Sequence, residues 1–329
     1  MYQIIQNRKI WLSISTVLVV TSVVFLAMWG LNFGIDFTGG SLLEVKFLEN
    51  RPSVTEVNSS LSDLDLGSLV TQSVDEDGMI FRFQNIDEAN HQEVLKRLND
   101  LASLESVDVN DEISTSSEDM ASSSVDIVET QNIASVQRVE ELRFDAVGPS
   151  IGQELKQKSV SAMMVVIVAI VLYIAWAFRR VSKPVASWKY GLSAIIALFH
   201  DVIITMGAFA FLGEFYNVEI TTAFVAAILT VLGYSVNDTI VVFDRVRENL
   251  PKSNDDFETT INTSVNQTIQ RSVNTSITTL VVLLSIFFFG GATIRDFVLA
   301  LSIGVFIGTY SSIFLASPVL VLWEKMGNK

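Results

Sequence analysis

Three ionisable residues lie inside long apolar stretches of this chain, where a charge is costly and implies a function. Asp201 stands in GLSAIIALFHDVIITMGAFAFL, about ten residues from either end and so near the membrane midplane. Asp238 stands in TVLGYSVNDTIVVFDRVREN, 17 residues beyond Thr221, and Arg271 stands 18 residues before Phe289. An acid and a guanidinium in such surroundings are candidates for binding and releasing an ion.

Asp238 and Arg271 are expected at the same depth of the membrane. At 1.5 Å per residue they lie about 26 Å and about 27 Å from the outer ends of their helices, so they could pair if those helices are neighbours. Burial disfavours the charged carboxylate and the guanidinium favours it, so a balanced pair can gain and lose a proton. The simpler alternatives are that Arg271 only extends to lipid headgroups and that Asp201 is satisfied by Thr205 or a neighbouring helix.

Polar and small residues recur at helical spacing around these charges. The polar stripe runs at steps of three and four residues through Gln267, Arg271, Asn274, Thr275, Thr278 and Thr279. A helix that faces only lipid would not carry such a stripe. A second series repeats every four residues and predicts close helix packing in the last apolar stretch; it consists of Ala300, Gly304, Gly308, Ser312 and Ala316.

The elements that position these residues are six predicted membrane-spanning helices. Half of the 329 residues are hydrophobic and the mean hydropathy is +0.43, which predicts a polytopic α-helical membrane protein. Spans need about 20 residues, and they are expected at 10–30, 159–178, 191–212, 220–243, 273–289 and 297–323, the last five within a domain 158–329. The first segment could be a cleaved signal peptide, but the bulky Met28 and Trp29 at its end favour an uncleaved anchor.

Lysine and arginine gather on one side of the predicted spans, which sets their orientation. They precede the first span, fill the connections after the second and fourth spans, and end the chain. The positive-inside rule then places both termini, including residues 1–9, in the cytoplasm and residues 31–157 outside. The net charge of −14 argues against a nucleic-acid partner, leaving membrane lipids as the surroundings.

Residues 31–157 predict a small extracytoplasmic α/β domain between the first two spans. Strands are expected at 41–48, 67–74, 79–84 and 133–144, and helices at 53–63 and 87–101, the first opened by a capping box of Ser53 and Glu56. This β-α-β-β-α-β order is typical of a ferredoxin-like module. The acidic segment at about 105–131 is expected to be a mobile insertion, and His91 to be a solvated helix residue without a metal.

The stretch GIDFTGGS, residues 34–41, resembles the phosphate-binding loop Gly-x4-Gly-Lys-Ser/Thr. Gly40 occupies the lysine position, and the glycines precede a strand instead of opening a helix, so no nucleotide cofactor is expected. Gly39 and Gly40 are predicted to turn the chain from the first span into the first strand, with Asp36 binding free N–H groups of that turn. Movement of the membrane helices would enter the outer domain here.

Together the motifs closely resemble the SecF branch of the SecD/SecF family of bacterial protein-export proteins, within the resistance-nodulation-division (RND) superfamily. They are GIDFTGG, VGPSIG, the HD pair at 200–201, GYSVNDTIVVFDRVREN, QTIQRSVNTSITT, FGGATIRDF and GTYSSIFLASP. The resemblance covers nearly the whole chain. Its departures, Ser272 where threonine is common and the acidic insertion, do not touch the charges.

The resemblance implies an accessory subunit of the Sec preprotein translocase in the bacterial cytoplasmic (inner) membrane. It would act with SecD beside the SecYEG channel, with YajC as a further partner, and use a proton or sodium gradient to draw unfolded preproteins outward. Carried over, Asp238 and its neighbour Asn237 match the transmembrane acid motif, Arg271 matches the basic residue of ion coupling, and Asp201 matches the acid of the HD pair. It would be a transport subunit and not an enzyme.

Three other functions stay open at this point. Half of an RND-type small-molecule or lipid exporter is the nearest alternative, although such exporters usually carry both six-span halves in one chain. An intramembrane aspartyl protease could use Asp201 and Asp238 as a pair sharing one proton, but the Gly-x-Gly-Asp context is absent. A passive assembly factor would leave the buried charges without a role.

Overall fold

The computed structural model describes residues 2–74, 76–104, 138–177 and 186–327. The chain divides into a helical unit, Met1–Gly34 with Leu155–Lys329, and an α/β unit, Ile35–Glu154. Within the described residues, six helices are long and apolar enough to cross a membrane, which confirms the predicted polytopic class. The predicted mobile insertion at 105–131 lies outside the described residues.

The six membrane helices differ from the predicted spans mainly at their ends. They comprise α1 (Arg8–Met28), α5 (Pro149–Ala177), α6 (Ser187–Tyr216), α7 (Thr222–Asn249), α8 (Phe257–Phe289), and a last span made of α9 (Ala292–Ser311), the π-helical η1 (Ser312–Ala316) and α10 (Ser317–Gly327). Helix α8 begins well before the predicted start at Val273. Gln267 and Arg271 therefore belong to a continuous helix.

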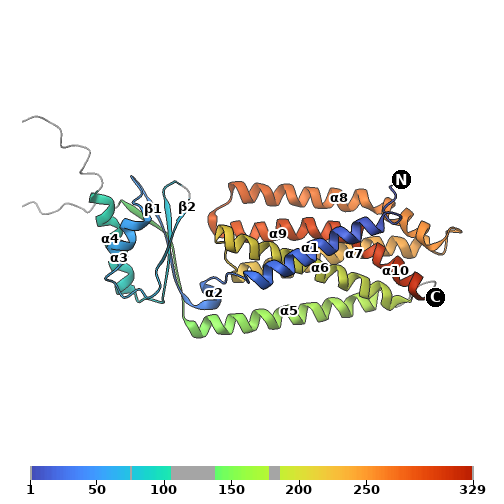
Figure 1. Ribbon diagram of the computed structural model, residues 1–329, viewed down its shortest axis with the longest axis horizontal. Coiled ribbons are helices and arrows are strands. Elements are labelled where there is room, and N and C mark those ends of the chain that lie inside the picture. Colours follow the sequence, from blue (N-terminus) through green and yellow to red (C-terminus); the bar gives the residue numbers. More distant parts are fainter. Residues whose placement is uncertain (1, 75, 105–137, 178–185, 328–329) are drawn as a thin grey trace, which may run out of the picture. The chain divides into compact units, whose positions relative to one another are not determined.

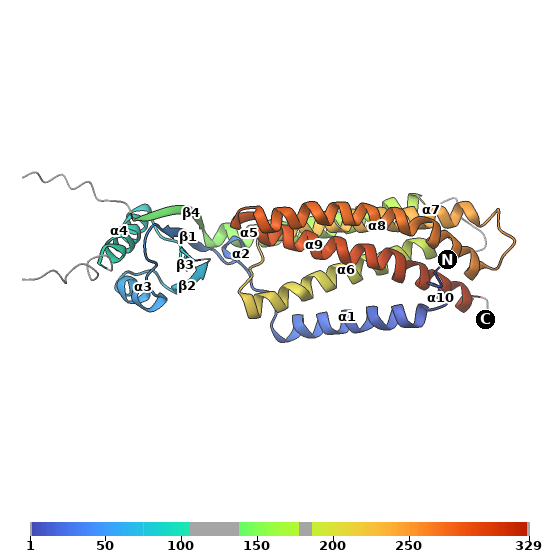
Figure 2. The same cartoon turned by 90° about the horizontal axis from the view of Figure 1, so that it is seen from above.

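Helices α7, α8 and α9 pack side by side, α6 packs against α7 and α9, and α1 lies along α6 (Figures 1 and 2). Tyr190 and Phe243 are fully buried between α6 and α7, with ring centroids 5.4 Å apart. Both ends of the chain lie at the same end of the bundle (Figure 1). That end also carries the connection between α7 and α8.

The residues before α1 are fastened to α8 by side-chain contacts. The Asn262 side chain accepts hydrogen bonds from the backbone N–H groups of Ile4 (3.0 Å) and Ile5 (3.2 Å). Glu258 forms an ion pair with Arg8 at 2.5 Å and a second one with Lys325 of α10. The first, fifth and sixth spans are thus held together at the end where the chain begins and finishes.

The π-helical segment η1 has a cause in the sequence. Pro318 lacks the N–H that an α-helix would direct to the carbonyl of Phe314, and its ring crowds that carbonyl. The helix widens over Ser312–Ala316 instead of breaking. Single-turn π segments of this kind frequently mark functional sites, and this one begins beside the buried polar network described below.

The α/β unit has the predicted ferredoxin-like order. Its elements are α2 (Ile35–Thr38), β1 (Gly40–Phe47), α3 (Val54–Leu61), β2 (Val70–Val74), β3 (Gly78–Phe83), α4 (Glu88–Leu104) and β4 (Val139–Val147). The strands form one antiparallel sheet in the order β2-β3-β1-β4. Alternate residues of β1 and β3, such as Leu43, Val45 and Phe81, are fully buried beneath α3 and α4.

Local sequence signals explain where these elements begin. The backbone N–H of Ser53 donates to Glu56 Oε2 at 2.9 Å and the N–H of Glu56 donates to Ser53 Oγ at 3.3 Å, confirming the predicted capping box. The Ser53 hydroxyl, followed by the Ser53 backbone, lowers the pKa of Glu56. Strand β2 is shorter than its prediction, and β4 runs to Val147, beyond the expected end at Phe144.

The prediction that His91 is solvated is wrong. The residue is 4% exposed, and its ring stacks on Phe144 with centroids 3.8 Å apart. Nδ1 lies 3.4 Å from a carboxylate oxygen of Glu88, and Nε2 lies 3.4 Å from one of Glu141. The ring thereby joins α4 to β4. The reason is helical phase, because His91 stands three and seven residues before the buried Val94 and Leu98.

Candidate functional site

Asp238 lies on the buried face of α7. Asp238 is 5% exposed, and its Oδ2 has no hydrogen-bond partner among the described residues. Buried carboxylates are normally paired, because an unpaired charge in an apolar medium is costly. One oxygen of the Asp238 carboxyl therefore lacks, among the described residues, the hydrogen bond that a buried carboxylate normally has.

Arg271 does not form the direct ion pair with Asp238 that equal depth suggested. Helices α7 and α8 are neighbours as required, but the described residues show no ion pair between these two, and Arg271 is exposed at the surface of this chain. Its charge still acts on the Asp238 carboxyl, as does the hydroxyl of the buried Ser272. The difference arises because each residue turns a helix by about 100°, so depth does not decide which side chain faces α7.

Helix α8 carries two polar faces where one was predicted. The buried face is a row of hydroxyl residues every four positions, consisting of Thr260, Ser264, Thr268, Ser272 and Ser276. The predicted stripe lies on another face; Gln267, Arg271, Asn274, Thr275 and Thr278 are exposed at the surface of this chain, and Thr279 is half-buried. Asn237 on α7 is exposed as well.

Polar contacts above and below Asp238 join α7 to α8. The hydroxyls of Tyr234 and Ser276 lie 3.3 Å apart on one side. On the other side Arg245 Nε donates to Gln267 Oε1 at 2.6 Å, and Asn249 donates to the same oxygen at 2.9 Å. A change of charge at Asp238 would therefore be felt at a contact held by hydrogen bonds, which can exchange partners.

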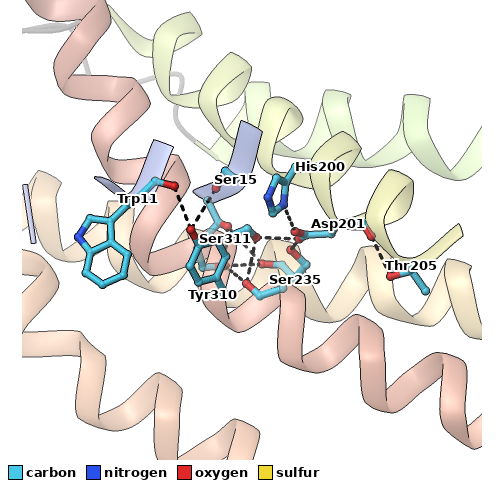
Figure 3. A network of polar contacts seen from close by, with 11 residues as sticks. Trp11, Ser15, His200, Asp201, Thr205, Ser235, Tyr310 and Ser311 are labelled. Atoms are coloured by element: carbon cyan, nitrogen blue, oxygen red, sulfur yellow. Dashed lines mark hydrogen bonds and ion pairs between the residues drawn. The ribbon is translucent and has the colours of Figure 1, made fainter. Parts of the chain in front are cut away.

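Asp201 is fully buried, with 0% of its surface exposed. Figure 3 shows the side chains around it. Its Oδ2 accepts hydrogen bonds from Ser235 of α7 at 2.5 Å and Ser311 of α9 at 2.8 Å. Its Oδ1 lies 2.9 Å from Nδ1 of His200. The Thr205 hydroxyl donates to the Asp201 main-chain oxygen and not to the carboxylate. Asp201 thus fastens α6 to both α7 and α9.

The network continues from Asp201 to α1 and to η1. Tyr310 Oη donates to the carbonyl of Trp11 at 3.0 Å and receives a hydrogen bond from Ser15 at 3.2 Å (Figure 3). Ser312, the first residue of η1, lies 3.0 Å from the Thr239 hydroxyl of α7. Polar groups from four of the six spans therefore meet in the interior of the bundle.

The predicted small-residue ridge lies against α7. A Cβ atom on Gly304 would come within 2.2 Å of Val231 Cγ2, and one on Gly308 within 3.0 Å of Ser235 Cβ. Ser312 is fully buried and bonds to α7 through Thr239. A still closer approach, absent from the prediction, occurs at Gly207 of α6, where a Cβ would lie 2.3 Å from Ser22 Cβ on α1.

The glycine turn lies within the α/β unit, between α2 and β1. Gly39 has φ +75° and Gly40 has φ +134°, backbone conformations that favour glycine. A Cβ on Gly39 would lie 2.8 Å from Pro149 Cα, and one on Gly40 2.8 Å from the carbonyl oxygen of Phe83. Asp36 lies in the first turn of α2. The turn is thus packed directly against the beginning of α5.

Replacing Gly39 with alanine is expected to impair the protein far more than replacing Gly30. Both glycines have a positive φ, but nothing lies within 4 Å of a Cβ on Gly30. Gly30→Ala therefore costs only backbone strain, about 1–2 kcal/mol, while Gly39→Ala adds a clash with the α5 backbone. The measurement is the unfolding temperature of the full chain in detergent. Equal losses in the two variants would contradict the packed turn.

Several residues of this site have no counterpart in the predictions. Ser235 and Ser311, which bind Asp201, stand 34 and 110 positions away from it, so the sequence alone does not join them. The buried hydroxyl row of α8, in contrast, is visible as a four-residue repeat in TTINTSVNQTIQRSVNTS. The neighbouring stripe draws attention first because it contains the charge of Arg271.

Six membrane helices with an α/β module after the first, and two buried acids of which Asp201 is bound across helices, define a multi-pass membrane protein of the transport class. Residues 127–326 match the family model of the protein export membrane protein SecD/SecF C-terminal domain, and residues 24–47 match the SecD/SecF GG motif. The chain belongs to the SecD/SecF family. It is a subunit of the protein translocase, as the relatives below also indicate.

Similar proteins cover this chain almost completely. A protein translocase subunit SecF of Thermobaculum terrenum is 38% identical over 98% of this chain and 94% of its own. A protein translocase subunit SecF of Magnetococcus marinus is 40% identical over 98% of this chain and 92% of its own length. The crystal structure of SecDF, a translocon-associated membrane protein from Thermus thermophilus, matches with 28% identity and a TM-score of 0.77 over 98% of this chain. This chain spans 39% of that SecDF polypeptide.

Proposed function

We propose that the protein is the SecF-type half of an ion-driven export machine in the bacterial cytoplasmic membrane. Acting with SecD beside the SecYEG channel, and with YajC as a further partner, it uses a proton or sodium gradient to draw unfolded preproteins outward. The observation that carries this proposal is Asp238, a buried carboxylate of a membrane helix with an oxygen that the described residues leave unpartnered. Such a group is costly unless it has an ion to bind.

The exposed polar face of α8 supports a membrane partner. Gln267, Arg271 and Asn274 would be costly if they faced lipid, so a second membrane protein covers them. The matched SecDF polypeptide is more than twice as long as the part this chain spans, which leaves room for a SecD half. Assembly of the two halves would bring Arg271 into a protein interior, where its charge acts on Asp238 more strongly.

The charge distribution supports the proposed orientation. The bundle end that holds both chain ends and the α7–α8 connection carries Arg8, Lys9, Arg247, Lys252 and Lys325. By the positive-inside rule this end is cytoplasmic, and the α/β unit is extracytoplasmic. A protease function gains no support, because Asp201 is bound by His200, Ser235 and Ser311 and not by Asp238.

The proposed mechanism begins with neutralisation of Asp238. Binding of a proton removes its attraction to the Arg271 charge, and the hydrogen-bonded contact between α7 and α8 exchanges partners. The movement reaches the α/β unit through α1, which leads into the Gly39–Gly40 turn, and through α5, which begins against that turn. Moving one charge through 100 mV supplies about 2.3 kcal/mol, enough to shift a two-state helix arrangement.

Sealed vesicles that contain the protein, its SecD partner and SecYEG test the proposal. A pH gradient or a sodium gradient is imposed separately. The rate at which preproteins complete their translocation (the completion rate) is measured together with ion flux. One of the two gradients is expected to raise the completion rate, by up to about 40-fold per charge and 100 mV, with ion flux in proportion. Matched vesicles without SecD should not respond. Completion that ignores both gradients would contradict ion coupling.

A further inference from the structure

His200 has a position that the Asp238 mechanism does not use. Its ring is 4% exposed on α6, with Nδ1 2.9 Å from Asp201 Oδ1 (Figure 3). Its other nitrogen, Nε2, is buried and makes no hydrogen bond to any described residue. Buried polar atoms are normally hydrogen-bonded, so the unpaired Nε2 calls for an explanation.

His200 also lines a cavity of about 350 Å³ between α1 and α6, which is open to the surface of the bundle. Its walls are mostly apolar, and the polar residues among its lining are His200, Ser15 and Thr16. The volume exceeds that of a single water molecule, about 30 Å³, by an order of magnitude. Water that enters the cavity would find the hydroxyls of Ser15 and Thr16 to bind, and it would reach the covered Nε2 of His200 once a small movement of the lining exposes that atom.

Asp201 itself is sealed from this cavity. The carboxylate is fully buried, and its Oδ2 is occupied by the hydroxyls of Ser235 and Ser311. Of the groups that bind the carboxylate, His200 is the one that also lines the cavity. The other groups facing the ring are Tyr310 of α9, with ring centroids 6.1 Å apart, and the hydroxyls of Ser15 and Thr16 on α1.

We propose that His200 is a proton relay that loads Asp201 from the cavity between α1 and α6. A hydronium ion in the cavity gives its proton to Nε2 and becomes water, while the Nδ1 proton passes to Asp201 Oδ1. The ring ends as the other neutral tautomer, and it regains the first when the proton leaves by the reverse route. The relay rests on the proposed ion coupling. It makes Asp201 a second proton-binding site besides Asp238.

Loading Asp201 has a structural consequence. A neutral carboxylic acid is a weaker acceptor than a carboxylate, so the hydrogen bonds from Ser235 and Ser311 weaken. These bonds hold α6 to α7 and α9 directly beside η1. Protonation of Asp201 would therefore weaken the contact of α6 with α7 and α9, next to the π-helical segment η1.

Two variants separate a relay from a structural role in the vesicles with SecD and SecYEG. His200→Gln keeps an amide donor for Asp201 but cannot pass a proton. The gradient-driven rate of preprotein translocation should therefore fall about tenfold or more, while the unfolding temperature is unchanged. His200→Ala leaves space beside the cavity, and added imidazole should restore most of the lost rate. Pyrrole, which has a similar size but no basic nitrogen, should not.

The outcomes are decisive in both directions. A His200→Gln protein with the full gradient response would overturn the relay, and so would loss in both variants without rescue by imidazole. Asp238→Asn is measured in parallel so that the two proposals stay separable. If Asp238→Asn is inactive while the His200 variants respond fully, the relay fails and the ion-driven function stands.

Discussion

Replacing Asp238 with asparagine is expected to abolish gradient-driven export and to leave the fold at least as stable. Asparagine has nearly the same shape but binds no proton and carries no charge. Because Asp238 Oδ2 makes no hydrogen bond to the described residues, few contacts are lost, and the cost of burying an unpaired charge disappears. The gradient-dependent completion rate should fall by about tenfold or more, while the unfolding temperature in detergent stays the same or rises.

The matched control is Asp244→Asn on the same helix. Asp244 is exposed and pairs with Arg247 at 2.5 Å, so its replacement removes an equal charge where solvent screens it. Its gradient response should be nearly normal. Arg271→Ala should lose the response as Asp238→Asn does, because the two charges act on one equilibrium. Full gradient-dependent export and ion uptake in both Asp238→Asn and Arg271→Ala would favour the passive assembly factor.

The sequence predicted the fold class because its signals are local. Length and apolar content are enough to identify the six spans, and the β-α-β-β-α-β order follows from alternation, helical periodicity and the Ser53–Glu56 cap. The end of a span is harder, as α8 shows. Its first part, Phe257–Ser272, is polar enough to resemble a loop, and it is helical because its buried hydroxyls pack against neighbours instead of lipid.

The sequence predicted which acids belong to the candidate site, but it did not predict which groups bind them. A charge in an apolar segment stands out, so Asp201 and Asp238 were found. Which groups bind them depends on the rotation of one helix against another. Depth placed Arg271 level with Asp238, yet Ser272 is the residue buried beside it. Long-range partners such as Ser311 leave no mark in the sequence around Asp201.

Helix packing leads to a ranking of four glycine-to-alanine variants. Gly207→Ala should be the most damaging, because its Cβ would lie 2.6 Å from the Cα of Ser22 and α1 must move away from α6. In Gly304→Ala the Cβ meets the methyl groups of Val231, which can shift within limits, and in Gly308→Ala it meets Ser235 Cβ at 3.0 Å. Overpacking of this kind costs about 1–3 kcal/mol.

Gly233→Ala on α7 is the control, since nothing lies within 4 Å of its Cβ. It should stabilise by about 0.5–1 kcal/mol, because alanine loses less backbone entropy in a helix than glycine. Unfolding by a denaturing detergent gives the order of the four. If Gly207→Ala were as stable as Gly233→Ala, then α1 would not pack closely against α6. The cavity at His200, which α1 and α6 line, would then not exist in this form. The ranking therefore tests the geometry on which the proton relay depends without measuring transport.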